Sequence, residues 1–250
     1  MIALSVNVNK IALIRNSREG NHPDVVAHAR TCIDAGADGI TVHPRPDQRH
    51  IRPHDVRELG QLTEQFAQVE FNIEGNPFAA PQGDYPGLMT LVEQTQPRQC
   101  TLVPDSSDQL TSDHGFDLTR SAESLLPVVS QLKALGVRIS LFMDADIEQI
   151  SLARELGVER IELYTGPYAA AWHDAKQRRE VYERYHSAAQ HATDIGLGVN
   201  AGHDLNLDNL ARFAQIPGLL EVSIGHALIV DAIDMGLYKA VQAYKALLRP

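Results

Sequence analysis

The chain has 250 residues, of which 44% are hydrophobic and 22% are charged, and this composition excludes a disordered chain, a fibre and a small disulfide-built scaffold. Its 22 Lys and Arg residues against 32 Asp and Glu residues give a formal net charge of -10, so the sequence predicts no partner among nucleic acids or anionic membranes. An anionic ligand therefore has to be bound by local groups.

Short β-rich runs alternate with helical patterns along the chain. A Gly often ends a predicted helix, because it tolerates the left-handed conformation, and a buried strand follows, as in the segment AGADGITV at 35–42. The predicted strands, in chain order, are residues 2–8, 39–43, 69–74, 99–103, 137–143, 160–164, 198–200 and 220–224. The predicted helices lie near residues 23–35, 53–67, 86–95, 121–135, 146–156, 174–195, 206–215 and 227–248.

Strand followed by helix, repeated without a break in composition, predicts an α/β fold in which residues 1–250 form a single (β/α)₈ TIM-barrel domain with extra helical segments. The alternative is an open doubly wound sheet. Such a sheet would typically carry fewer strands and a Gly-rich nucleotide turn after strand one, where this chain has Asn7-Val8-Asn9-Lys10.

Two connections are predicted to lie over the barrel mouth. Residues 75–87, after strand three, contain three Pro and three Gly, which exclude a regular helix. Residues 104–118, after strand four, are rich in Asp and Ser and form a second candidate lid. After strand six, residues 168–195 supply an unusually long helix.

The cysteines and the N-terminus bear on the compartment. Cys32 and Cys100 each lie in an apolar stretch, which predicts buried thiols in a reducing cytosol. The first ten residues contain no basic leader, and no stretch reaches the ~18 uninterrupted apolar residues of a membrane span. We therefore expect a cytoplasmic protein.

In a barrel of this kind the chemistry lies where strands end and the following loops begin. Several histidines at one rim favour catalysis over isolated structural roles. The residues at these positions are Asn7, Asn9, Lys10, His43, Arg45, Glu74, Asp144, Asp146, Glu162, Thr165, Asn200, His203, Gly225 and His226.

The turns Gly202-His203 and Gly225-His226 indicate a phosphate site. Each follows a predicted strand and precedes a predicted helix, whose N-terminus would expose unpaired N–H groups. The alternative is that the two glycines only form tight turns.

After strand two, His43 and Arg45 would point to the same side if the strand continues that far, which would suit proton transfer beside an anion. Glu74 ends a buried strand, where desolvation would make it a base near neutral pH; the alternative is a structural partner for Lys10 or Arg45. His43, His50, Glu74 and His203 could be drawn together as ligands of a divalent metal, but strand one has Asn-Val-Asn where barrel metallohydrolases have His-x-His, so no metal is predicted.

At these residues the sequence resembles the pyridoxine 5′-phosphate synthase family. The similarity covers nearly the whole chain, and motifs of this length in this order are specific to the family. The motifs are SVNVNKIALIRNSR, GADGITVHPRPDQRHI, FNIE, TLVPD, SLFMDAD, VNAGHDL and SIGHALI.

The resemblance implies that 3-amino-2-oxopropyl phosphate condenses with 1-deoxy-D-xylulose 5-phosphate to give pyridoxine 5′-phosphate, inorganic phosphate and water. It implies no metal, no organic cofactor and a homo-octamer. By motif position, His43 and Glu74 resemble the two proton acceptors and His203 the proton donor.

The same resemblance divides the remaining site residues between the two substrates. The residues that resemble ligands of the aminoketone phosphate are Asn7, Arg18, Asp204, Gly225 and His226. Those that resemble ligands of deoxyxylulose phosphate are Asn9, Lys10, Arg45, His50 and Thr111.

Three features depart from the family pattern. Asn9-Lys10 stands where the family commonly has Asp-His, Asp204 stands where it has Gly, and residues 75–87 form a longer connection. Two alternative functions remain open. One is a phosphosugar epimerase or aldolase with Lys10 as a Schiff-base amine, and the other is a phosphosugar-binding barrel without catalysis.

Overall fold

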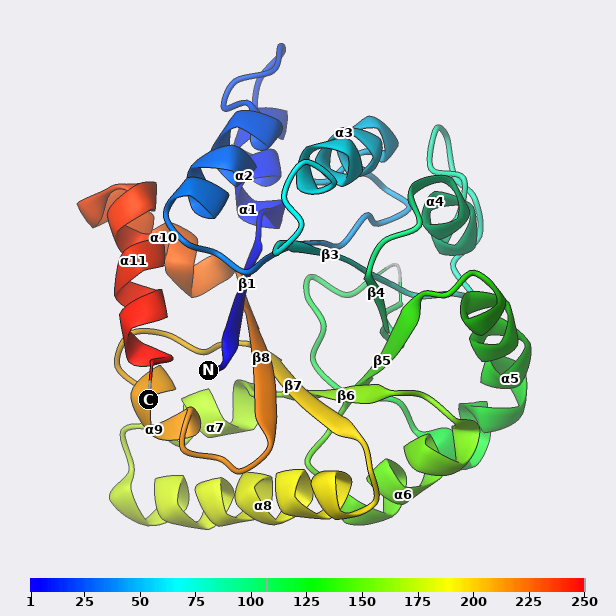
Figure 1. The fold of residues 1–250 in the computed structure, drawn as a ribbon, viewed down its shortest axis with the longest axis vertical. Coiled ribbons are helices and arrows are strands. Elements are labelled where there is room, and N and C mark those ends of the chain that lie inside the picture. The colour runs from blue at the N-terminus through cyan, green and yellow to red at the C-terminus, as the bar shows by residue number, and fades with distance from the viewer. Residues whose placement is uncertain (107, 250) are drawn as a thin grey trace.

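The structure, a computed structural model, describes residues 1–106 and 108–249. In this part of the chain eight parallel strands close into a barrel in sequence order, which confirms the predicted TIM-barrel fold (Figure 1). The strands are β1 (Ala3–Asn7), β2 (Gly39–Val42), β3 (Glu70–Gly75), β4 (Gln99–Leu102), β5 (Arg138–Met143), β6 (Arg160–Tyr164), β7 (Gly198–His203) and β8 (Leu219–Ile224).

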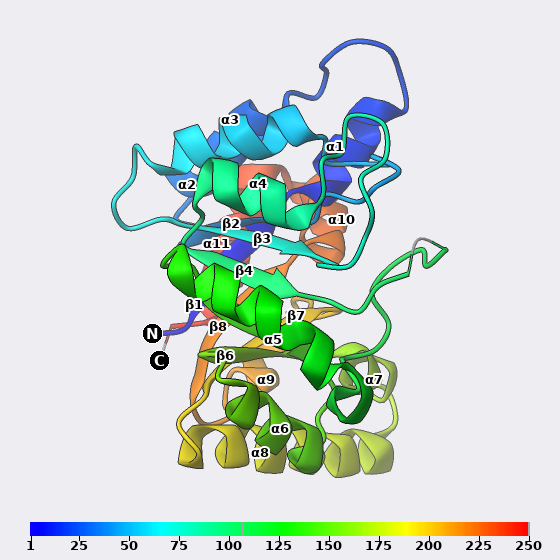
Figure 2. The same cartoon turned by 90° about the vertical axis from the view of Figure 1, so that its right-hand side faces the viewer.

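Helices surround the barrel, and Figure 2 shows them packed around the strands from the side. Their apolar faces and the strands together form one buried core. The helices are α1 (Asn9–Asn16), α2 (Val25–Asp34), α3 (Pro53–Thr63), α4 (Leu88–Thr95), α5 (Leu118–Ala134), α6 (Ile147–Leu156), α7 (Gly166–Ala170), α8 (Ala175–Asp194), α9 (Leu210–Phe213), α10 (His226–Met235) and α11 (Leu237–Leu247).

The strand register determines which side chains meet at the barrel mouth. β1 pairs with β8, so that Val6 lies opposite Ile224, and it pairs with β2, so that Asn7 lies opposite Thr41. Because all eight strands are parallel, their carboxyl ends reach the same rim. The loops that follow these ends therefore share one face of the molecule.

Four helix predictions need correction. The sequence analysis missed α1 and α7, which are short helices that directly follow β1 and β6. The predicted helix 227–248 is two helices, because Gly236 has φ +84° and ψ 143°, a conformation that no helix can continue. The predicted helix 206–215 shrinks to the single turn of α9, because the side-chain oxygens of Asn206 and Asn209 each accept from the other residue's backbone N–H, and Asn209 Nδ2 donates to the carbonyl of Asp204.

The two predicted lids differ in what they contact. Residues 75–87 form no helix, as predicted, and carry one isolated bridge between Gln82 and Tyr85. In the second lid, 104–118, residue 107 lies outside the described residues. Leu110, Thr111 and Ser112 of this lid line the cavity at the mouth.

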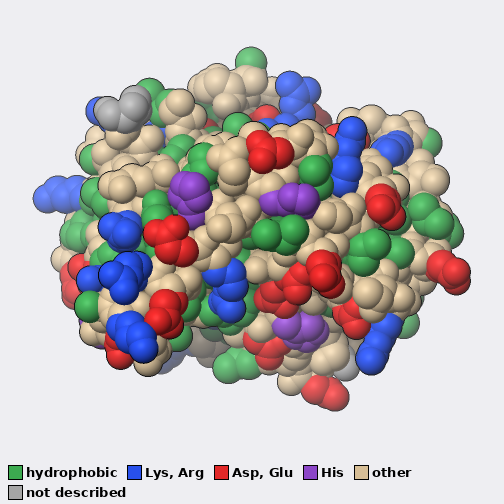
Figure 3. All heavy atoms as spheres, turned by 90° about the horizontal axis from the view of Figure 1, so that it is seen from below, with side chains coloured by type: hydrophobic (Ala, Val, Ile, Leu, Met, Phe, Trp, Pro, Cys, Tyr) green, Lys and Arg blue, Asp and Glu red, His purple; other side chains and the backbone are tan. Residues whose placement is uncertain are grey.

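Both cysteines are free thiols buried in the core, as predicted. Burial raises the pKa of Cys32 to about 12 and raises the pKa of Cys100 as well. Among the described helices, none has the length and apolar character required to cross a membrane. On the face that holds α8, basic and acidic side chains are interspersed (Figure 3).

Candidate active site

A cavity of about 360 Å³ lies at the carboxyl ends of the strands. It brings together every residue that the family resemblance assigns to proton transfer or substrate binding except Arg18, which is exposed beyond the end of α1 and does not line it. Of the other strand-end candidates, Glu162 lines the cavity, whereas Asp144, Asp146, Thr165 and Asn200 do not. The predicted residues that line the cavity are Asn7, Asn9, Lys10, His43, Arg45, His50, Glu74, Thr111, His203, Asp204, Gly225 and His226.

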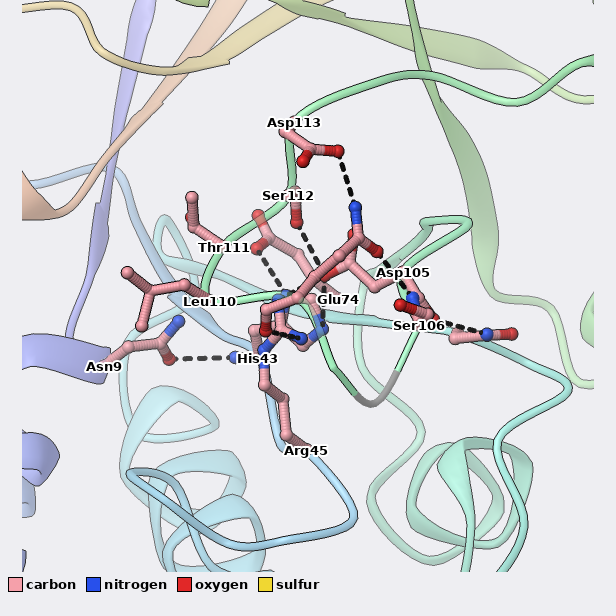
Figure 4. A network of polar contacts seen from close by, with 12 residues as sticks. Asn9, His43, Arg45, Glu74, Asp105, Ser106, Leu110, Thr111, Ser112 and Asp113 are labelled. Carbon is pink, nitrogen blue, oxygen red and sulfur yellow. Dashed lines mark hydrogen bonds and ion pairs between the residues drawn. The ribbon is translucent and has the colours of Figure 1, made fainter.

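His43, which directly follows β2, lies between two carboxylates (Figure 4). Its Nδ1 is 3.8 Å from Oε2 of Glu74, and its Nε2 is 3.7 Å from Oδ2 of Asp105. Its backbone N–H donates to Oδ1 of Asn9 at 2.9 Å. Burial, and next the charge of Arg45, hold the pKa of His43 well below its usual range. The imidazole is therefore neutral and is able to accept a proton.

Glu74 on β3 is a buried carboxylate at the base of the cavity. Ser223 Oγ donates to Oε1 at 3.4 Å, and Asn7 Nδ2 donates to Oε2 at 3.5 Å. Burial, followed by the nearby charge of Asp105, raises the pKa of Glu74 to about 8. As its buried position predicts, Glu74 is thus a base of near-neutral strength.

The alternative role predicted for Glu74 is that of an ion-pair partner of Lys10 or Arg45, and the structure shows neither ion pair in the part of the chain that it describes. Among the described residues, Glu74 forms no salt bridge with either cation. Lys10 lines the cavity, and its charge contributes to lowering the pKa of His50. Arg45 is engaged by a different carboxylate.

That carboxylate is Asp105, which the sequence analysis did not single out. Arg45 Nη2 and Ser112 Oγ both donate to Oδ2 of Asp105, the latter at 2.8 Å, and the Asp105 residue is 5% exposed. Arg45 Nη1 also reaches the carbonyl of Gln109 at 3.5 Å. One signal could have identified Asp105, because it is the first carboxylate after β4 and ends the motif TLVPD. The pair fixes the guanidinium beside His43.

His50 is buried and uncharged. Burial, followed by the charges of Arg45 and Lys10, lowers its pKa to about 3. Its Nδ1 accepts a hydrogen bond from the N–H of Ile51 at 2.9 Å, so the proton of the neutral ring is on Nε2. His50 is therefore a neutral hydrogen-bond donor rather than a cation.

Helix α1 holds the loop that carries His50. Arg15 is buried and forms a bidentate ion pair with Asp55 of α3, and its Nη2 donates to the carbonyl of His50 at 3.1 Å. Asn16 Nδ2 lies 3.2, 3.1 and 2.8 Å from the carbonyls of residues 48, 49 and 50. Side chains outside the cavity thus fix one of its walls.

His203 ends β7 with a backbone φ of +106°, a conformation that side-chain-bearing residues rarely adopt. Its Nε2 is 2.7 Å from Oγ1 of Thr111, and its Nδ1 is 2.8 Å from Oδ2 of Asp204. The ring of Tyr164 stands nearly perpendicular to the imidazole, with 5.3 Å between centroids. The side chain is therefore contacted at both nitrogens and on the ring.

The two Gly-His turns differ. The expectation of a helix N-terminus at Gly202-His203 is wrong, because β7 continues to His203 and the next helix begins only at Leu210. Gly202 is needed for another reason: a Cβ there would lie 2.2 Å from Oε1 of the buried Glu162. At Gly225-His226 the predicted helix N-terminus is confirmed, since α10 begins at His226.

Helix α10 presents its N-terminus to the cavity without a side-chain cap. In contrast, the first turns of α2, α6 and α8 are capped by aspartates. The free N–H groups and the positive end of the helix dipole favour an anion there. Within residues 1–106 and 108–249, no group of three or more His, Cys, Asp or Glu side chains is arranged to hold a metal ion.

Comparisons with known proteins show which family the chain resembles. Residues 4–250 match the family model described as pyridoxal phosphate biosynthesis protein PdxJ. The pyridoxine 5′-phosphate synthase of Xanthomonas axonopodis pv. citri is 58% identical over 247 residues, which cover 98% of this chain and 96% of the relative. That of Xylella fastidiosa is 54% identical over 242 residues, which cover 96% and 92%.

Solved structures of much lower identity share the fold alone. The 3-hexulose-6-phosphate synthase of Salmonella typhimurium has a TM-score of 0.65 at 13% identity and covers 99% of this chain and 98% of its own. The thiamine phosphate pyrophosphorylase of Pyrococcus furiosus has a TM-score of 0.61 at 13% identity and covers 99% and 95%. Since the family model spans nearly the whole chain and full-length relatives share more than half of its residues, the chain belongs to the pyridoxal phosphate biosynthesis protein PdxJ family.

Proposed function

We propose that this chain is a pyridoxine 5′-phosphate synthase, which condenses 3-amino-2-oxopropyl phosphate with 1-deoxy-D-xylulose 5-phosphate. The products are pyridoxine 5′-phosphate, inorganic phosphate and water. The observation that carries the proposal is the meeting of His43, Glu74 and His203 in one cavity, beside the uncapped N-terminus of α10. Full-length relatives at 54–58% identity support the same activity.

The three side chains divide the proton transfers of such a condensation. Joining an amine to a ketone, eliminating phosphate and closing a ring each require one group to release a proton and another to receive one. His43 and Glu74 act as proton acceptors, because the first is neutral and the second has a pKa of about 8. His203 acts as the proton donor through Nε2, the nitrogen that lies beside Thr111 of the lid.

The two substrates are assigned to different residues that line the cavity. Asn7, Gly225, His226 and the α10 N-terminus bind the aminoketone phosphate, while the deoxyxylulose phosphate is bound by the residues around His50. Arg18 is exposed and is not among the residues that line the cavity, so its assignment to the first substrate has no support in this geometry. The assigned ligands of the second substrate are Asn9, Lys10, Arg45, His50 and Thr111.

Incubation of the purified protein with both substrates tests the function. The expected result is fluorescence of pyridoxine 5′-phosphate together with release of inorganic phosphate, and neither signal with one substrate alone. If borohydride trapped a substrate on Lys10, the epimerase or aldolase alternative would replace this proposal. Tight binding of both substrates without turnover would instead indicate a binding protein.

Inorganic phosphate is expected to bind at Gly225-His226. The N–H groups of α10 are uncapped, whereas those of α6 are satisfied by Asp146, so the second helix serves as an internal control. A crystal soaked in phosphate would show an anion at α10 and none at α6. An empty α10 site with anions elsewhere in the cavity would remove the physical basis of this substrate assignment.

Lys10→Met is expected to weaken the binding of deoxyxylulose phosphate by roughly tenfold or more, the scale of one lost charge-assisted hydrogen bond. Binding of the aminoketone phosphate should barely change, because the proposal assigns Lys10 to the other substrate together with His50, whose pKa its charge helps to lower. Separate titrations of the two substrates measure both effects. Equal weakening of both substrates, or of neither, would contradict the assignment of Lys10.

We also infer that the protein works in the cytoplasm as a homo-octamer. Two buried free thiols suit a reducing compartment. Helices α1 and α10 lie side by side and expose apolar side chains that an interface between copies would cover (Figure 1). These side chains are Leu13, Ile14, Val230 and Ile233.

A further inference from the structure

The residue after His203 is Asp204, and its carboxylate faces the imidazole rather than a substrate position. Oδ2 of Asp204 is 2.8 Å from Nδ1 of His203. The hydrogen bond from His203, opposed by partial burial, lowers the pKa of Asp204. The carboxylate is therefore ionised at neutral pH and accepts only, so the proton between the two side chains belongs to Nδ1.

The backbone of Asp204 is held independently of its side chain. Its N–H donates to Oγ1 of Thr165 at 3.3 Å, and its carbonyl accepts from Nδ2 of Asn209 at 3.2 Å. Thr165 Oγ1 in turn donates to the carbonyl of Gly202 at 2.8 Å. These bonds span the strained φ of +106° at His203 on both sides. The chain is thus fixed where the carboxylate has to meet the ring.

We propose that Asp204 is a positioning residue for His203, whose ring it fixes with Nδ1 protonated and Nε2 directed at Thr111 and the reacting groups. The inference rests on the proposed function, in which Nε2 of His203 supplies the proton. In each turnover Nε2–H gives its proton to the departing oxygen, while Nδ1–H stays bonded to Asp204. Nε2 then regains a proton from solvent, which balances the proton that His43 or Glu74 accepts and releases to solvent.

Asp204 meets His203 at Nδ1, whereas the other ring nitrogen, Nε2, lies beside Thr111. The aspartate does not need to touch a substrate to affect the reaction. Its removal should therefore alter kcat more than either KM.

Three variants test the proposal. Asp204→Gly removes the acceptor, Asp204→Asn keeps an acceptor oxygen without the charge, and Asp208→Asn removes a nearby exposed charge as the matched control. Neutron crystallography of the wild type and of Asp204→Gly reports which ring nitrogen carries deuterium. Steady-state kinetics of all three variants separate kcat from the KM of each substrate.

We expect deuterium on Nδ1 of His203 in the wild type, and a turned ring or deuterium on Nε2 alone in Asp204→Gly. The kcat of Asp204→Gly should fall by about tenfold to a hundredfold, with both KM values within about twofold of the wild type. Asp204→Asn should recover part of that loss and restore the ring orientation. Asp208→Asn should match the wild type.

Two results would overturn the inference. One is an unchanged ring and unchanged kcat in Asp204→Gly. The other is a rise in the KM of the aminoketone phosphate with kcat preserved, which would make Asp204 a substrate ligand. A wild type that forms no pyridoxine 5′-phosphate would refute the proposed function instead, and the deuterium position would still decide the contact between the two side chains.

Discussion

Glu74→Gln is expected to lower kcat by about 10²-fold or more, the usual loss when a positioned base is removed. The amide has the shape of the carboxyl group and can keep the contact with Ser223, but it cannot accept a proton. Steady-state rates measure the loss, and circular dichroism checks the fold. Glu58→Gln, at an exposed position of α3, is the matched control and should retain full activity.

The raised pKa of Glu74 predicts how activity and stability change with pH in the wild type, and these changes should be missing from Glu74→Gln. The wild-type rate should rise with pH towards about 8, because only ionised Glu74 acts as a base. The free energy of unfolding should instead decrease as the pH rises. The folded pKa lies above the ordinary value of 4.5, so stability from the neutral carboxyl group is fully present below 4.5 and is lost as pH rises through about 8.

At pH 9 the Gln variant should therefore melt at the wild-type temperature or above it, since the buried charge is gone. A variant that is folded and nearly fully active would remove Glu74 from the mechanism. Loss of activity together with a lower melting temperature at every pH would mean that Glu74 serves the fold rather than the chemistry.

His203→Ala is expected to lower kcat by about 10²-fold or more while leaving the barrel intact. Alanine has a Cβ, as histidine does, so position 203 still carries a side chain at φ +106°. The variant removes the imidazole alone. The lost contacts are those to Thr111 and Asp204. His173→Ala, at an exposed position after α7, serves as the control for a lost imidazole.

Free imidazole in the assay should restore part of the activity of His203→Ala and none in Glu74→Gln. Such rescue separates a missing proton donor from a damaged fold. Near-normal turnover by His203→Ala without added imidazole would refute the role of this side chain, and failure of both substrates to bind would show that it acts in binding.

The strands were predictable from sequence and several helix boundaries were not. Most strands leave a short β-rich run in the sequence, often after a Gly, and this signal needs no knowledge of the rest of the fold. The break at Gly236 was missed because the apolar pattern continues across it, although its φ of +84° ends α10. The N-terminal helix α1 was missed because NKIALIRN was interpreted only as a source of site residues.

The members of the candidate site could also be predicted, but their pairings could not. Strand-end position alone identifies His43, Glu74 and His203. The contact between Thr111 and His203 joins residues 92 positions apart, and it depends on where a loop settles over the closed barrel. Asp105 was missed for the same reason, since its partner Arg45 is 60 positions away.

The buried pair between Arg15 and Asp55 affects how substitutions in this protein are to be interpreted. Neither side chain lines the cavity, yet together with Asn16 they fix the backbone that carries His50. A survey scored only by vitamin production would place such positions among the catalytic ones, because breaking a buried ion pair leaves an uncompensated charge. The residues whose substitution lowers activity in this barrel therefore include residues that do not contact the substrates.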